Sequence, residues 1–185
     1  MRFALSFLLL CPVAAMALDL TPIPDEKVLE GVHIPRLRFK TTKGSVTWTP
    51  PAEWRMTYED GRLLFLAKDY THASFELRVI PRVAEDVEVL AKPGELVKYV
   101  EPLLPKTAKG IAGGGTNIGP FTINGIAAKE FLFDFQEPSH ASRGSVSIVD
   151  LNERERLIVV ISAQRKDFEA VRTIGIASMF SWQGE

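Results

Sequence analysis

Apolar and polar residues alternate in several short stretches of the chain, which is the pattern of strands with one buried face. Leu37 and Phe39 begin one such alternation, and a turn at 43–44 connects it to Val46 and Trp48, which predicts a first hairpin. The Asp-Gly pair at 60–61 is favoured in tight hairpin turns. Further strands are predicted at 62–68, 74–80, 127–135, 144–151 and 156–163.

Two other stretches place apolar residues three and four positions apart, as on one face of a helix. The first follows Pro93 and ends at Pro105, and the second starts near Asp167. The order of strands, helix, strands and helix predicts an α+β fold. Its helices pack on an antiparallel β-sheet, which distinguishes it from a parallel nucleotide-binding fold.

The beginning of the chain has the features of a secretory signal peptide. Arg2 precedes an apolar run to Leu10 that is too short to cross a bilayer, and Ala15 and Ala17 are the small residues of a cleavage site. We therefore predict a signal peptide at 1–17. Residues 18–35 carry three prolines and four acidic residues, which predicts an extended lead-in outside the core, followed by a single domain at 36–183.

Cys11 is the only cysteine and raises the alternative of a lipoprotein anchored through it. Leu10 precedes it where the lipoprotein-processing peptidase prefers Gly, Ala or Ser, so simple cleavage after Ala17 is favoured. We expect an exported protein, either periplasmic or extracellular. Loss of Cys11 with the signal excludes disulfides, Fe–S clusters and zinc fingers, and no later apolar segment approaches the length of a transmembrane span.

Charge and composition narrow the class of partner. The chain has 22 basic and 23 acidic residues, a formal net charge of −1, so it has no basic surplus to attract nucleic acid. Its 185 residues are 46% hydrophobic, which is enough for one well-packed core.

The element order and three groups of residues resemble the PsbP-like superfamily. Residues 46–49 lead into the Pro50–Trp54 segment, 125–129 precede an aromatic strand, and 168–180 with Trp182 resemble the family's closing helix. The resemblance implies an α/β/α sandwich, a fold shared by a photosystem subunit, a Ran-binding nuclear import factor and bacterial envelope proteins. Every matching residue is a packing residue, so the resemblance transfers no active site. The glycine run and the proline-bearing lead-in are departures from the family pattern.

Histidines and nearby carboxylates are the candidates for a metal site. His33, His72 and His140 are the only histidines, and Asp69 and Glu137 each stand three residues before one of them. Two loops that each offer a carboxylate and an imidazole could meet around zinc or another divalent ion. The spacings of known zinc motifs are absent and nothing in the sequence brings the loops together. We therefore expect ordinary polar surface residues and assign no metal ligand.

The glycines of 110–119 invite comparison with a phosphate-binding loop, because backbone N–H groups next to glycine can approach an anion closely. They are Gly110, Gly113, Gly114, Gly115 and Gly119. No Gly-Lys-Ser or Gly-Lys-Thr follows, and the next predicted element is a strand. We expect a connection between helix and sheet.

Other candidate residues have simpler structural interpretations. Ser145 has only half of the G-x-S-x-G pattern of a serine hydrolase and lies in a predicted strand. Asp134 is expected on the solvent side of a strand. Asp134 and Asp150 do not indicate glycoside hydrolysis, because that assignment requires the distance between the two carboxyl groups. We assign no catalytic and no cofactor-binding residue, and expect no cofactor.

Aromatic residues could line a ligand pocket or form the core. Phe131, Phe133 and Phe135 alternate and so share one sheet face, where a helix would cover them. Trp48, Trp54 and Trp182 could likewise line a pocket or lie in the core. Core positions are favoured because aromatic side chains dominate burial in ordinary domains.

These observations lead to one functional hypothesis and one alternative. By analogy with the fold, we expect a non-enzymatic envelope protein that binds a macromolecular partner, most simply a protein. The alternative is a small-ligand binder or an enzyme whose site is assembled from loops. An exposed apolar patch would favour the first, and a deep pocket with perturbed titratable groups the second.

Overall fold

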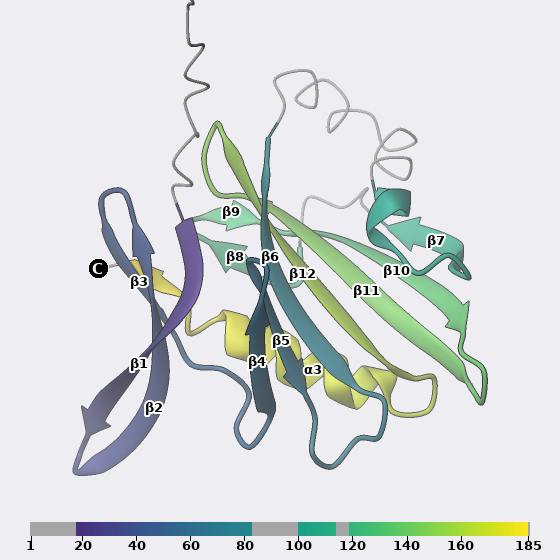
Figure 1. Cartoon of the computed structure of the whole chain (residues 1–185), viewed down its shortest axis with the longest axis horizontal. Helices are drawn as coiled ribbons and strands as arrows, with labels where there is room; N and C mark the ends of the chain where they lie inside the picture. The colour runs from purple at the N-terminus through teal and green to yellow at the C-terminus, as the bar shows by residue number, and fades with distance from the viewer. Residues whose placement is uncertain (1–17, 83–99, 114–118, 185) are drawn as a thin grey trace, which may run out of the picture.

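The computed structural model describes residues 18–82, 100–113 and 119–184 (Figure 1). The predicted signal peptide at 1–17 and most of the helix predicted between Pro93 and Pro105 lie outside the described residues. The described end of that predicted helix is a 3-10 helix, η1 (Glu101–Leu103).

A four-stranded antiparallel sheet begins and ends the described chain. Its order is β1 (Leu18–Leu29), β2 (Val32–Thr41), β3 (Gly44–Trp48) and β13 (Gln183–Gly184). The β2–β3 hairpin is the one predicted from the alternation at 37–48, with Phe39 opposite Val46 and Leu37 opposite Trp48. The first and last strands of the described chain thus belong to one sheet.

The structure corrects the prediction for residues 18–35. They do not form a lead-in outside the core, because they make up β1 and the first part of β2, which pair from Leu18 opposite Thr41 to Leu29 opposite Val32. Leu18 and Leu20 are buried. The prolines are tolerated because β1 pairs on one side only, so Pro22 and Pro24 lie in an edge strand.

A seven-stranded antiparallel sheet forms the body of the domain. Its order is β4 (Arg55–Glu59), β5 (Arg62–Leu66), β6 (Ser74–Pro81), β12 (Glu155–Gln164), β11 (Ala141–Asp150), β10 (Lys129–Gln136) and β7 (Lys109–Gly113). Asp60 and Gly61 have φ angles of 50° and 73° and form the predicted tight turn between β4 and β5. A separate pair consists of β8 (Thr122–Ile123) and β9 (Ile126–Ala127).

Helix α3 (Phe168–Met179) lies along one face of the large sheet, as Figure 1 shows. Its apolar side contributes Phe168, Val171 and Met179 to the main core. The helix begins after Asp167, as the sequence predicted, and its last turn leads to Trp182. A partly buried hydrogen bond joins β3 to the last turn of α3, because the indole Nε1 of Trp48 donates to the carbonyl of Ser178 at 3.0 Å.

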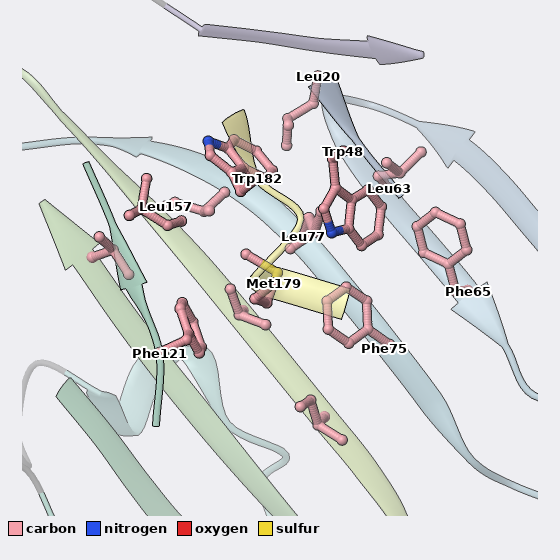
Figure 2. Packing of buried hydrophobic residues seen from close by; sticks show 14 of the residues in the cluster. Leu20, Trp48, Leu63, Phe65, Phe75, Leu77, Phe121, Leu157, Met179 and Trp182 are labelled. Carbon is pink, nitrogen blue, oxygen red and sulfur yellow. The ribbon is translucent and has the colours of Figure 1, made fainter. Parts of the chain in front are cut away.

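The main core fills the space between the two larger sheets and α3 (Figure 2). Alternate residues of β6 and β12 point into it, as period-2 strands require. Its centre is an aromatic group in which Trp48 stacks on Phe75 at 5.7 Å and meets Phe65 edge-on at 5.3 Å. Trp182 stacks on Phe39 at 5.7 Å, so the end of the chain closes this core.

A second apolar cluster lies on the opposite face of the large sheet. Phe131, Phe133 and Phe135 form it together with residues of β11 and β12, and Val100 is buried against them. The fold is therefore a mainly antiparallel α+β arrangement. Among the described residues α3 is the only α-helix, and it covers one face only.

Candidate functional site

The most exposed apolar residues of β1 and β2 gather at the turn of their hairpin. Val28, Leu29 and Val32 are 58%, 52% and 61% exposed, and we call these three residues the apolar tip. The turn itself is Glu30 and Gly31, whose φ angles of 51° and 80° are those of a tight two-residue hairpin turn. Figure 1 shows this turn standing away from the body of the domain, at the lower left.

Pairing within the hairpin decides which tip residues share a face. Leu29 lies opposite Val32 and Val28 lies opposite His33. Since directly opposed residues of an antiparallel pair share a face, Leu29 and Val32 point to one side and Val28 to the other. Ile34 continues the Leu29 and Val32 side. The apolar tip therefore exposes apolar surface on both sides of the hairpin.

Charged side chains hold the hairpin at mid-length. Asp25 on β1 accepts hydrogen bonds from Arg36 at 2.7 Å and from Arg38 at 3.3 Å, and Arg36 donates to Thr47 of β3. The pKa of the Asp25 carboxyl is lowered: desolvation raises it, but the amide of Glu26 and the charge of Arg38 outweigh that effect. With Leu18 and Leu20 buried at the base, the hairpin has a fixed root and an exposed end.

Two of the three histidines come together with a carboxylate, which the sequence did not predict. His72 lies in the β5–β6 loop, and Glu137 and His140 lie in the β10–β11 loop. One ligand atom from each residue lies within 4.8 Å of the others, and we call this group the histidine cluster. His33 is on β2 instead, 2.9 Å from Glu26, and Asp69 is not part of the cluster.

Sheet order explains why these two loops meet. Ser74 of β6 and Ser142 of β11 pair with Ser162 and Gln164 of β12, which lies between the two strands. The loops that precede β6 and β11 therefore emerge at the same end of β12. Because β6 and β11 are far apart along the chain, local sequence pattern has no signal for this proximity.

The glycine-rich segment is only partly described. Gly110 and Gly113 belong to edge strand β7, which pairs with β10, and 114–118 lie outside the described residues. A Cβ at Gly113 would lie 2.3 Å from the carbonyl oxygen of Glu130, so this glycine permits close pairing of the two strands. Strand packing thus accounts for one glycine of the predicted connection.

The other candidates are in structural positions. Ser145 is fully buried in β11, as expected for an ordinary strand residue. Asp134 is on the face opposite the phenylalanines and accepts a hydrogen bond from Arg165 at 2.9 Å, and Asp150 accepts one from Arg156 at 2.6 Å. The aromatic residues considered for a pocket lie in the two cores, with Trp54 partly buried.

A hollow lies at the end of β11 and β12 that is far from the histidine cluster. Leu18, Thr41 and Trp182 line it, together with residues 151–155. None of the residues that the sequence analysis weighed for catalysis or metal binding lines this hollow. No helix within the described ranges has the length and apolar character needed to cross a membrane.

Comparison with known proteins gives structural likenesses alone. No family model and no curated protein matches the sequence. One similar structure is a crystal structure from Bacteroides thetaiotaomicron VPI-5482, with 11% identity and a TM-score of 0.49. The match covers 76% of this chain and 45% of that chain, so this chain spans less than half of that protein.

Two further similar structures have named proteins. LpqN of Mycobacterium tuberculosis, which is involved in cell envelope biogenesis, is 14% identical, with 75% of this chain and 82% of that chain covered and a TM-score of 0.49. Cyanobacterial PsbP (CyanoP) from Synechocystis sp. PCC 6803 is 9% identical, with 86% and 98% covered and a TM-score of 0.45. The sequence resembles the PsbP-like superfamily, and a PsbP is among the structures to which this chain is similar.

Proposed function

We propose that this chain is an exported protein that binds a partner protein through the apolar tip of its β1–β2 hairpin. The observation that carries the proposal is the exposure of Val28, Leu29 and Val32 together on one projecting turn. Export is supported by the signal-peptide pattern at 1–17. Such an exported protein would reside in the cell envelope or in the medium. The hairpin is its binding element.

The energetics of the apolar tip favour binding. Single exposed apolar side chains are common on protein surfaces, but here three lie beside one two-residue turn, Leu29 and Val32 on one side of the hairpin and Val28 on the other. Completing the burial of a half-exposed Val or Leu contributes about 1 kcal/mol. The salt-bridged hairpin is ordered before binding, so little conformational entropy is lost when a partner covers the tip.

The charges around the tip favour a protein over a lipid surface. Glu30 lies in the turn between Leu29 and Val32, and Glu26 and Lys27 precede Val28. Elements that bind membrane surfaces normally carry an excess of Lys and Arg to attract anionic lipids. A partner with an apolar groove and a mixed-charge rim fits this surface. Pro22 and Pro24 on the outer edge of β1 oppose binding by strand addition there.

The proposal includes the finer architecture, an α/β/α sandwich. The second apolar cluster leaves Phe131, Phe133 and Phe135 on the sheet face opposite α3, and Val100 packs against them. Val100 belongs to the helical periodicity that the sequence shows between Pro93 and Pro105. A helix over this face would complete the sandwich and leave the β1–β2 hairpin as the projecting element.

The test compares two triple variants of the purified protein. Val28→Ser, Leu29→Ser and Val32→Ser together remove the apolar tip. Met56→Ser, Ile126→Ser and Phe180→Ser together remove exposed apolar residues elsewhere and serve as the matched control. Each protein is immobilised and exposed to envelope extract, and the retained proteins are identified by mass spectrometry. Circular dichroism confirms that each variant is folded.

The proposal predicts one protein that the wild type and the control variant retain and the tip variant loses. With that protein purified, the tip variant should bind at least about tenfold more weakly, which corresponds to about 1.4 kcal/mol. Equal retention by the tip variant, or loss of retention by the control variant, would show that the tip is not the binding surface.

A further inference from the structure

The histidine cluster has the composition of a transition-metal site. Two imidazoles and one carboxylate are a ligand set that Zn²⁺ and related divalent ions accept, whereas Mg²⁺ and Ca²⁺ prefer oxygen ligands throughout. His72, Glu137 and His140 each direct a ligand atom into one small volume, within 4.8 Å of one another. They come from two loops, so the fold assembles the group.

The separations within the cluster fit a metal ion of this size. Ligand atoms about 2.0–2.1 Å from a tetrahedral zinc lie roughly 3.4 Å from each other. Glu137 Oε2 is 2.9 Å from His140 Nε2 and 3.9 Å from His72 Nδ1, so the two distances bracket that value. The two imidazole rings are 4.3 Å apart between centroids and inclined by 42°. Each of the two carboxylate–imidazole distances is about half an ångström from the spacing that a tetrahedral ion requires.

His140 is held in the orientation that a ligand needs. Its Nδ1 shares a hydrogen bond of 2.9 Å with the hydroxyl of Ser139, which leaves Nε2 directed toward Glu137. Metal-binding histidines typically use their second ring nitrogen in this way. The Nε2 atom is buried, and no group among the described residues meets hydrogen-bond geometry with it. The Glu137 carboxylate is 2.9 Å away from this nitrogen, so the two groups face the same small volume.

Both loops are fixed by their own backbone hydrogen bonds. The Glu137 amide donates to the His140 carbonyl at 3.0 Å, and the side chain of Gln136 donates to both of these residues' carbonyls. In the other loop the Ala73 amide donates to the Tyr70 carbonyl at 3.0 Å. His72 has a φ angle of 63°, an uncommon backbone conformation that recurs at functional sites. The ligands are therefore positioned before any ion arrives.

We propose that His72, Glu137 and His140 bind a divalent metal ion of the Zn²⁺ class, with His72 Nδ1, His140 Nε2 and a carboxylate oxygen of Glu137 as ligands. Three protein ligands leave a fourth tetrahedral position for water or for a group from another molecule. The site is at the end of the large sheet and is separate from the apolar tip. This inference does not depend on the proposed function.

The test measures Zn²⁺ binding by isothermal titration calorimetry on the purified protein with any affinity tag removed. His72→Asn and Glu137→Gln each remove one ligand, and His33→Asn, which removes the histidine outside the cluster, is the matched control. His72 is 45% exposed, so its replacement should leave the fold intact, and circular dichroism checks each variant. In a second measurement Co²⁺ replaces Zn²⁺, and its visible absorption spectrum reports tetrahedral coordination without relying on the calorimetric signal.

We expect one Zn²⁺ per chain in the wild type and in His33→Asn, a tetrahedral Co²⁺ spectrum, and affinity at least about tenfold lower in His72→Asn and Glu137→Gln. Ser139→Ala, which frees the second nitrogen of His140, should weaken binding by about tenfold. The proposal is overturned by the absence of saturable binding in the wild type. It is also overturned if His33→Asn loses as much affinity as His72→Asn.

Discussion

Glu130 and Arg172 form the ion pair that joins β10 to α3. Arg172 donates two hydrogen bonds to the Glu130 carboxylate, one of them 2.8 Å long, and both side chains are largely buried. The hydrogen bond to Glu130 raises the pKa of Arg172, with the carboxylate charge adding to it. A bidentate pair of this kind fixes geometry as well as supplying energy.

Glu130→Gln should lower the free energy of unfolding by about 1–3 kcal/mol, because the amide replaces a charged acceptor and leaves an arginine donor unpaired. Glu169→Gln is the control. Glu169 is 4.0 Å from the same arginine but 71% exposed, so its loss should cost less than about 0.5 kcal/mol. Urea denaturation measures both. Equal effects from the two variants would contradict a special role for Glu130.

The sequence was most informative about which single residues pack on which face of a strand. The alternation of Phe131, Phe133 and Phe135 correctly placed them on one face with Asp134 opposite. The histidine cluster was not predictable, because His72 and Glu137 approach one another only through the pairing of β6 and β11 with β12. Local pattern carries no information on that pairing.

Among the elements, β1 is the one whose sequence pattern was misleading. Prolines and charged residues fill its middle, and only Leu18 and Leu20 show the alternation of a buried strand. The strong hairpins were predictable because their turns contain residues that suit left-handed φ angles, as at Asp60 and Gly61. The β1–β2 hairpin has a similar turn at Glu30 and Gly31, but the prolines and charged residues of β1 interrupt the alternation that identifies a strand.

Two leucines of β1 provide a direct test of its place in the core. Leu20→Ala should lower the free energy of unfolding by about 2–4 kcal/mol, because Leu20 is buried in the main core. Leu29→Ala, in the same strand but at the exposed apolar tip, should change it by less than about 0.5 kcal/mol. Thermal or urea unfolding of the two variants measures these changes in the free energy of unfolding. A negligible effect at Leu20 would mean that β1 is dispensable for the core.

At the scale of the whole molecule, the two candidate binding features are on different parts of the domain. The apolar tip ends a hairpin of the four-stranded sheet, whereas the histidine cluster is at one end of the seven-stranded sheet. The main core connects these sheets through Trp48, Trp182 and α3. Metal binding and partner binding can therefore be tested by separate substitutions in one folded protein.

The most direct test of the proposed function is site-specific photo-crosslinking in intact cells that export the protein. A photoreactive amino acid replaces Val32 at the apolar tip or, as the control, Ile126, which is 41% exposed on β9. We expect an adduct with one partner protein from position 32 and no such adduct from position 126. No adduct from position 32, or the same adducts from both positions, would contradict binding through the hairpin.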